Sequence, residues 1–182
     1  MRLSLLAAPL LGLLAACQPA TTAPTATGPD VLTTTDFEQS IGWGDADGAS
    51  LTTEKAHSGR WSVRVKPDVP FGFTYARQLG DLSTTPMHTL QLDAWALRVA
   101  AGSTAQLVVQ VTASKTDETN VFYYAHPLAT AVPTLGEWTA VRVPINLPTS
   151  ASGNNRLKVY IWNGSATAPT YLDDVTLRRV SK

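Results

Sequence analysis

The sequence has few of the residues that mark several common classes of protein. Its 182 residues include one cysteine and three histidines, and 14 lysines and arginines balance 14 aspartates and glutamates. A lone cysteine excludes a disulfide within the chain. The zero net charge, without a basic cluster, argues against binding to nucleic acid through its phosphates. The expected partner is therefore a small molecule, a glycan or a protein.

Catalytic motifs are also scarce. His57, His88 and His126 stand outside any HExxH string and lack the spacing of a zinc site. The sequence contains neither a Gly-x-Ser-x-Gly elbow nor a glycine-rich phosphate loop. We expect His57 in a turn and His88 at a strand entry. Only His126 is a candidate for a binding face, and a structural hydrogen bond is the alternative for it.

The first sixteen residues have the layout of a secretory signal. A positive charge at Arg2 precedes an apolar run over residues 3–14 that is too short to span a bilayer. The string Leu14-Ala15-Ala16-Cys17 resembles the lipobox of bacterial lipoproteins. That resemblance implies cleavage after Ala16 and acylation of Cys17, so that several acyl chains anchor the protein to a lipid bilayer. The alternative is a soluble secreted protein with a stray thiol.

The residues after the signal predict a tether and then one domain. Gln18 stands where an aspartate retains some bacterial lipoproteins at the inner membrane, so we expect a place in the bacterial cell envelope at the outer membrane. Residues 17–30 are rich in Thr, Ala and Pro and lack aromatics, which predicts a flexible tether. Residues 31–182 have the length of a single domain, which we expect to be monomeric.

From residue 31 onward, apolar and polar residues alternate with a period of two, interrupted at Gly, Pro, Asn and Asp. This pattern predicts an all-β domain, and no segment has a helical stripe. Many short strands at this spacing are typical of a two-sheet antiparallel β-sandwich of the jelly-roll kind. The predicted strands span residues 32–38, 50–55, 61–66, 72–79, 89–99, 106–113, 121–128, 138–147, 157–163 and 171–179.

The alternation also separates the two sides of several strands. In residues 90–95 the leucines and Ala94 share one side, and in residues 157–162 the aliphatic side chains do the same. The opposite side is polar yet carries large aromatic rings, and we predict that it forms an open binding face. The predicted ligand-binding residues are Gln91, Asp93, Trp95, Gln110, Tyr124, Arg142, Tyr160 and Trp162.

The side assignment is ambiguous in residues 121–128. Phe122, Tyr124 and His126 alternate with a second set that includes Tyr123, and either set has the apolar area to be buried. We predict that Phe122, Tyr124 and His126 lie on the open face.

Such a face suits carbohydrate. The apolar C–H side of a pyranose ring stacks on an indole or phenol, and its hydroxyls bond with amide, carboxylate or guanidinium groups. A glycosidase needs two carboxylates and this face offers only Asp93. We therefore predict a non-catalytic protein that binds a glycan or polysaccharide. In the alternatives, the aromatics only cover the sheet, or they serve a protein-interaction or structural module of an outer-membrane assembly. A third alternative, an enzyme, would require a second carboxylate or a metal with an open position near Asp93.

A series of short motifs runs through the domain in a recognisable order. They are Asp36-Phe37-Glu38, Trp43, Ala56-His57-Ser58-Gly59-Arg60-Trp61-Ser62, Asp93-Ala94-Trp95-Ala96, Gly136-Glu137-Trp138 and Tyr171-Leu172-Asp173-Asp174-Val175-Thr176-Leu177. Over residues 31–182 this order resembles the galactose-binding-like jelly rolls, which include carbohydrate-binding modules of the CenC type and domains of Bacteroidetes surface lipoproteins. The resemblance bears more on fold than on sugar binding.

The same resemblance implies a structural calcium ion between the first strand, the turn at His57 and the last strand. By position, Glu38 and Asp173 are its carboxylate ligands. Calcium takes hard oxygen ligands and would join the first strand to the last. Alternatively, Asp173 belongs to a solvated turn and Glu38 is exposed at a strand end. Supporting oxygens in the family pattern come from Asp36 or Asp174 and from the backbone near Lys55 and Ser58.

Overall fold

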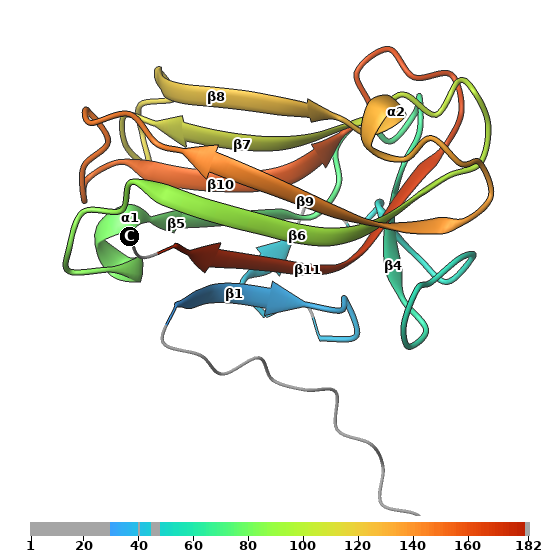
Figure 1. Ribbon diagram of the computed structural model, residues 1–182, viewed down its shortest axis with the longest axis horizontal. Coiled ribbons are helices and arrows are strands. Elements are labelled where there is room, and N and C mark those ends of the chain that lie inside the picture. The colour runs from blue at the N-terminus through green and yellow to red at the C-terminus, as the bar shows by residue number, and fades with distance from the viewer. Residues whose placement is uncertain (1–29, 40, 45–47, 181–182) are drawn as a thin grey trace, which may run out of the picture.

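The computed structural model describes residues 30–39, 41–44 and 48–180, which form a sandwich of two antiparallel β-sheets (Figure 1). The predicted signal, the lipidation residue Cys17 and the tether up to residue 29 lie outside the described residues. None of the helices in the described part of the chain is long and apolar enough to cross a bilayer.

One sheet, here named sheet A, contains the first and last strands of the domain. Its order is β3-β4-β11-β6-β9, and β1 pairs with β11 beyond the end of β4. Its strands are β1 (Val31–Thr35), β3 (Leu51–Thr52), β4 (Ser62–Val65), β6 (Thr89–Arg98), β9 (Trp138–Asn146) and β11 (Thr170–Arg179).

The other sheet, named sheet B, lies behind sheet A in Figure 1 and has the order β2-β5-β10-β7-β8. Two four-residue helices, α1 (Leu79–Leu82) and α2 (Leu128–Ala131), follow strands of this sheet in the described chain. The strands of sheet B are β2 (Trp43–Gly44), β5 (Thr74–Gln78), β7 (Gln106–Thr112), β8 (Asn120–Pro127) and β10 (Arg156–Trp162).

The core lies between the sheets and is built from alternate residues of the long strands. Leu90 and Leu92 of sheet A and Leu107, Leu157 and Ile161 of sheet B are fully buried there. Each such side chain contributes about 1.5–3 kcal/mol by leaving water. The alternation that the sequence predicts for residues 90–95 and 157–162 is therefore confirmed, with the leucines inward in both sheets.

Arg98 is an exception to this apolar interior. It is only 7% exposed at the end of β6, and its guanidinium donates to backbone carbonyls. Nε donates to Ser103 O at 2.7 Å, and Nη1 donates to Ala129 O at 3.0 Å and to Val132 O at 2.8 Å. A third nitrogen, Nη2, donates to Ala101 O at 3.3 Å. Arg98 thereby ties α2 to the end of β6.

All ten predicted strands are present, with ends that differ by one to three residues in most cases. The short strand β2 and the two short helices were not predicted. A two-residue strand is too short to show a period of two, and a single helical turn is too short to show a helical stripe. The predicted two-sheet antiparallel β-sandwich is confirmed.

Candidate functional site

A shallow groove crosses the outer face of sheet B and has a volume of about 580 Å³. It runs over strands β2, β5, β10 and β7. Its lining combines aromatic, amide and cationic side chains on a floor of small residues. The lining residues are Gly42, Gly44, Phe71, Thr74, Ala76, Arg77, Gln110, Arg156, Lys158 and Tyr160.

Strand register builds the groove. In β10, Lys158 and Tyr160 point outward because Val159 and Ile161 between them enter the core. Lys158 is paired with Gln110 of β7 on one side and with Ala76 of β5 on the other. The small side chain at Ala76 leaves the space beside β10 open, which creates the hollow.

Two aromatic side chains lie next to each other in the groove. Phe71 is 54% exposed, and its ring centroid is 6.1 Å from that of Tyr160 at an angle of 59°. The loop before β5 is fixed there by a bridge between Phe71 and Trp162 and by a 2.9 Å hydrogen bond from the Gly72 N–H to Ile161 O. Exposed apolar area on Phe71 is thus held in a defined place beside a phenol.

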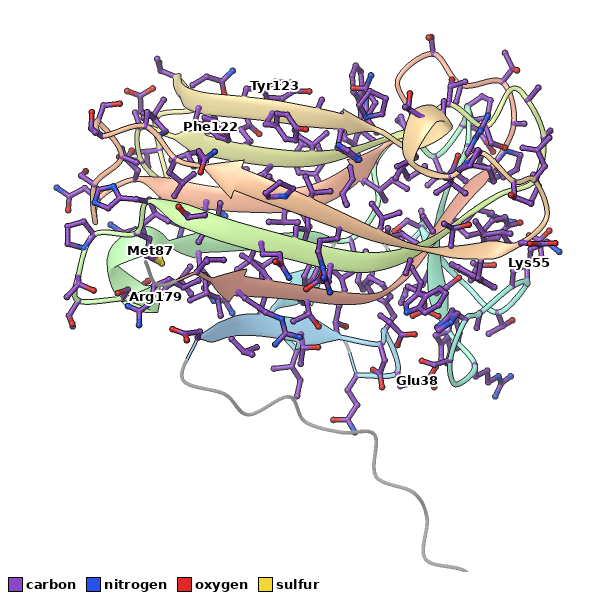
Figure 2. All side chains as sticks on the ribbon, viewed as in Figure 1. Glu38, Lys55, Met87, Phe122, Tyr123 and Arg179 are labelled. Carbon is purple, nitrogen blue, oxygen red and sulfur yellow. The ribbon has the colours of Figure 1, made fainter. Side chains whose placement is uncertain are left out.

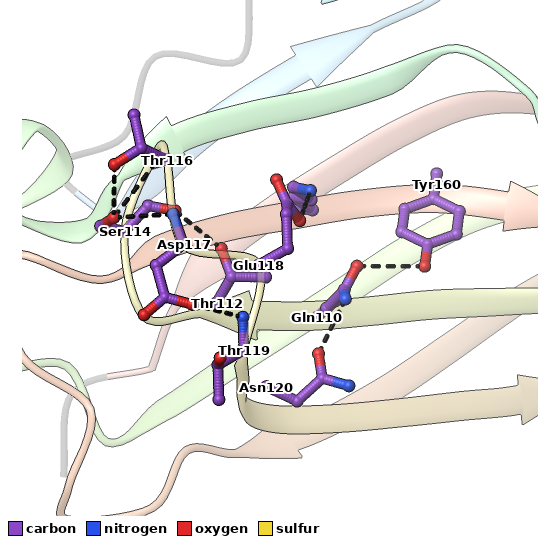
Figure 3. A network of polar contacts seen from close by, with 10 residues as sticks. Gln110, Thr112, Ser114, Thr116, Asp117, Glu118, Thr119, Asn120 and Tyr160 are labelled. Carbon is purple, nitrogen blue, oxygen red and sulfur yellow. Dashed lines mark hydrogen bonds and ion pairs between the residues drawn. The ribbon is translucent and has the colours of Figure 1, made fainter.

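Tyr160 continues into a chain of polar groups on the same face (Figure 3). Its hydroxyl donates to Gln110 Oε1 at 3.2 Å, and Gln110 Nε2 donates to Asn120 Oδ1 at 2.8 Å. Burial, with Tyr123 and Glu118 nearby, raises the pKa of the Tyr160 hydroxyl to about 12. The hydroxyl therefore stays protonated, and the Gln110 amide is held in one orientation.

The groove is also cationic. Lys158 pairs with Glu118, and Arg77 lies with its guanidinium carbon 5.7 Å from the centre of the Tyr75 ring. Arg77 reaches the groove beside Gly42, whose φ of +81° disfavours any other residue, and a Cβ at that position would lie 3.1 Å from Arg77 Nη2. Arg156 makes no ion pair with the described residues.

The prediction of a single binding face is wrong, because the predicted residues lie on the two opposite outer faces of the sandwich. Gln91, Asp93, Trp95 and Arg142 belong to β6 and β9 of sheet A, whereas Gln110, Tyr160 and Trp162 belong to sheet B. Alternation gives the side of each strand but not the sheet in which that strand pairs. Gln110 and Tyr160 line the groove, and Trp162 lies beside it without lining it.

On sheet A the predicted polar residues are paired with one another. Asp93 accepts from Arg142 Nε at 2.8 Å, from Gln91 Nε2 at 2.8 Å and from Arg178 Nε at 3.4 Å. Burial alone would raise the pKa of Asp93, but these donors, Arg142 first, hold it below the ordinary value. Asp93 thus already accepts hydrogen bonds that sugar hydroxyls would otherwise donate.

Trp95 is covered as well. The His57 ring stacks on it with centroids 3.8 Å apart and an angle of 14°, and His57 also meets the edge of Trp138 at 5.7 Å. His57 lies in the turn before β4, where the sequence predicts it. One flat face of Trp95 is therefore occupied by a side chain of the protein itself and is closed to a pyranose.

The side assignment for β8 is also wrong. Phe122 and Tyr124 pair with Val111 and Val109, which face the core, while Tyr123 pairs with the outward Gln110. Tyr123 and Phe122 project from neighbouring positions of β8 (Figure 2). Because β8 is the edge strand, Tyr124 remains 37% exposed although it is on the inner side.

His126 shares the inner side of β8 with Tyr124. Its Nδ1 is 3.2 Å from the Tyr124 hydroxyl, so it makes a structural hydrogen bond, and burial lowers its pKa. The predicted binding residue Tyr124 and the candidate His126 therefore lie away from the groove.

The two predicted calcium ligands both hold the turn at residues 57–61. Asp173 is fully buried, and its Oδ2 accepts the N–H groups of His57 at 2.8 Å and Ser58 at 3.2 Å. Glu38 lies after β1 and its Oε1 accepts the N–H groups of Arg60 and Trp61, each at 2.6 Å (Figure 2). The carboxylates thus meet one turn from two sides.

Backbone amides occupy oxygens that the calcium hypothesis assigns to a metal. In residues 30–39, 41–44 and 48–180, no three acidic or histidine side chains lie close enough together to hold an ion. Burial raises the pKa of Asp173 to about 6, against the lowering effect of the His57, Asp174 and Ser58 N–H groups. Calcium at this turn stays a prediction. The two carboxylates that would bind it, Glu38 and Asp173, already accept hydrogen bonds from backbone amides.

The sequence did not identify three prominent groups of the groove. Phe71 lies in the loop before β5, just ahead of the predicted strand that begins at residue 72. Arg156 lies just ahead of the predicted strand that begins at residue 157. By alternation Arg77 belongs to the side of β5 that faces the core, since it pairs with Leu157, and its side chain reaches the groove only around the edge of the sheet. No local pattern brings these residues together, since their position depends on the pairing of β10 with β5.

Neither a known family model nor a curated protein matches this chain. Solved structures do match. The CBM22-2 xylan-binding domain of Paenibacillus barcinonensis Xyn10C has a TM-score of 0.57 at 18% identity, covering 82% of this chain and 99% of that one. The C-terminal family 22 carbohydrate-binding module of Clostridium thermocellum Xyn10B has a TM-score of 0.53 at 15% identity, covering 84% and 96%. These similarities confirm the jelly-roll sandwich.

The fold is also similar to a chain that is not described as a binding module. The enzymatically active domain of bacteriophage CBA120 tailspike protein 4 has a TM-score of 0.51 at 14% identity, covering 80% of this chain and 20% of that one. Similarity of fold at such identities leaves function open. The function therefore has to be argued from the groove.

Proposed function

We propose that the domain binds a polysaccharide in the groove of sheet B and does not convert it chemically. The observation that carries this proposal is the pair of Phe71 and Tyr160 next to the oriented amide of Gln110 in an open hollow. The hollow crosses four neighbouring strands, which suits a chain better than a single sugar. Its open shape leaves both ends of a bound chain free to extend.

Each part of a sugar has a partner in this groove. The C–H side of a pyranose stacks on the exposed ring of Phe71, where contact with an apolar surface replaces water. The second Nε2 hydrogen of Gln110 and the phenol oxygen of Tyr160 bond with hydroxyls on the rim of the sugar. Stacking then supplies most of the affinity, and the hydrogen bonds select the sugar.

Two further points support a binding role. None of the ten described lining residues is Asp or Glu, whereas glycoside hydrolysis ordinarily uses a pair of carboxylates across the scissile bond. The similar modules from Paenibacillus barcinonensis and Clostridium thermocellum are named as a xylan-binding domain and a carbohydrate-binding module. Xylan is therefore the first polymer to test.

The test is affinity electrophoresis of the unlipidated chain from residue 17, carrying Cys17→Ser, through gels that contain xylan or other plant, algal and bacterial polysaccharides. We expect retarded migration in at least one gel. Phe71→Ala and Tyr160→Ala should each reduce the retardation severalfold. Tyr124→Ala, which removes a tyrosine from the inner side of β8, away from the groove, should not. Absence of retardation by every polymer would refute the proposal and favour a protein-interaction module.

We also infer that the protein is a lipoprotein of the bacterial envelope, anchored through acylated Cys17. The support is the sequence Leu14-Ala15-Ala16-Cys17 after a short apolar run. In cells fed an alkyne-labelled palmitate, the wild-type protein should carry the label. On fractionation of the membranes, it should be found with the outer membrane. Cys17→Ser should abolish the label, and labelling that persists in this variant would refute the anchor.

A further inference from the structure

The charges that line the groove are all of one sign. Arg77, Arg156 and Lys158 contribute three cations, and no described lining residue is acidic. The whole chain nevertheless has zero formal net charge. The positive lining is therefore a local feature of this face rather than a consequence of a basic protein.

In the described part of the molecule, ion pairs neutralise only one of these three cations. Lys158 has Glu118 as a partner, but neither Arg77 nor Arg156 pairs with a described carboxylate. Arg77 Nη1 donates to Ala76 O at 3.0 Å, which leaves most of its donors unused. On the opposite outer face, by contrast, Arg142 and Arg178 both bind Asp93.

The cations lie beside the predicted stacking site. Arg156 and Lys158 are successive outward residues of β10, so their backbones are about 7 Å apart. Tyr160 is the next outward residue of the same strand, and Phe71 is adjacent to it. A sugar stacked at Phe71 and Tyr160 thus places its neighbours in the chain, or its substituents, within reach of Lys158 and Arg156.

We propose that the groove selects polysaccharides that carry carboxylate groups, as uronic acids do, with Arg156 and Arg77 as the carboxylate partners. This inference rests on the proposed function, because it names the class of polymer for the same site. A guanidinium presents parallel N–H donors that match the two oxygens of a carboxylate, and such charge-assisted bonds are stronger than those to hydroxyls. A neutral polymer would leave these donors to water.

The experiment compares one polymer in two charge states. Glucuronic-acid-substituted xylan and the same xylan after reduction of its carboxyl groups are cast in parallel gels, and migration of the Cys17→Ser chain is measured in each. We expect the acidic polymer to bind about tenfold more tightly, as expected for one partly exposed charged hydrogen-bonding contact. Because exposed charges are screened, the preference should shrink from about 0.01 M to about 1 M salt.

Variants assign the preference to residues. Arg156→Gln and Arg77→Gln should each weaken binding of the acidic xylan by a larger factor than binding of the reduced xylan, so that the ratio between the two polymers falls. Arg60→Gln removes the same charge from the turn before β4, outside the groove, and should keep the preference. Thermal unfolding of each variant checks that the fold is retained.

The outcomes separate this inference from the proposed function. Equal retardation by both xylans, lost in Tyr160→Ala, would overturn the carboxylate preference and leave polysaccharide binding standing. A preference that persists in the Arg77→Gln, Arg156→Gln double variant would overturn the assignment to these residues. Retardation by a sulfated polymer but not by the uronic-acid polymers would overturn the carboxylate class. Absence of retardation by any polymer would refute polysaccharide binding itself, and this inference with it.

Discussion

Replacing Trp95 by alanine should destabilise the domain and leave the proposed polysaccharide binding unchanged. Trp95 is half-buried on the outer face of sheet A, with His57 stacked on it at 3.8 Å. Half of a tryptophan side chain is about 100 Å², which at about 25 cal/mol per Å² amounts to about 2.5 kcal/mol. Loss of the ring stack adds about 0.5 kcal/mol or more. The free energy of unfolding should therefore fall by about 3 kcal/mol.

Circular dichroism during heating measures this change. For a domain of this size, about 3 kcal/mol corresponds to a drop of roughly 6–12 °C in the unfolding temperature. Trp95→Phe keeps a ring against His57 and should recover a good part of that drop. The reasoning would be refuted if Trp95→Ala unfolded at the wild-type temperature, or if it lost retardation in a gel that retards the wild-type chain.

Three more predictions concern stability. Asp173 has a folded-state pKa of about 6 against an ordinary value of 3.8, so the folded state holds its proton longer. Stability should therefore fall by about 3 kcal/mol as the pH rises from about 4 to 6. Urea unfolding across this range should show this loss of free energy in the wild-type chain and not in Asp173→Asn. The same dependence of the unfolding free energy on pH in both chains would contradict the prediction. Arg98→Met leaves several buried carbonyls without donors and should cost about 3 kcal/mol or more in urea; wild-type stability would rule out this role. If calcium binds at Glu38 and Asp173, a chelator should lower the unfolding temperature by mass action, and an unchanged midpoint would argue against the ion.

The strands of this domain were predictable because buried and exposed positions alternate along consecutive residues. In β6 and β10 every second residue enters the core, and that alternation is visible in the sequence over six or more positions. Leu90, Leu92, Leu157 and Ile161 are accordingly inward, as predicted. In β8 the alternation failed, because an edge strand leaves both sides partly exposed and aromatic residues occupy both.

The site was predictable only in part, because a site depends on which strands are neighbours. Gln110 and Tyr160 were identified from their own strands, and β7 and β10 happen to be paired. Trp95 was identified by the same reasoning, but its strand lies in the other sheet and its ring is covered by a turn 38 positions earlier in the chain. Arg77 points around a sheet edge, which no period in the sequence reports.

The position of β1 determines how the domain responds to force. Asp30 lies against Arg179, with a 2.7 Å bond from the Arg179 N–H to Asp30 O, and β1 is paired along one side only, to β11. A pull on the chain ahead of Asp30 reaches the sandwich through that five-residue strand. A pull perpendicular to β1 would load the bonds between β1 and β11 one after another, whereas a pull along the strand would load them together. Under a perpendicular pull, β1 would detach from β11 before sheet B, which carries the groove, is loaded.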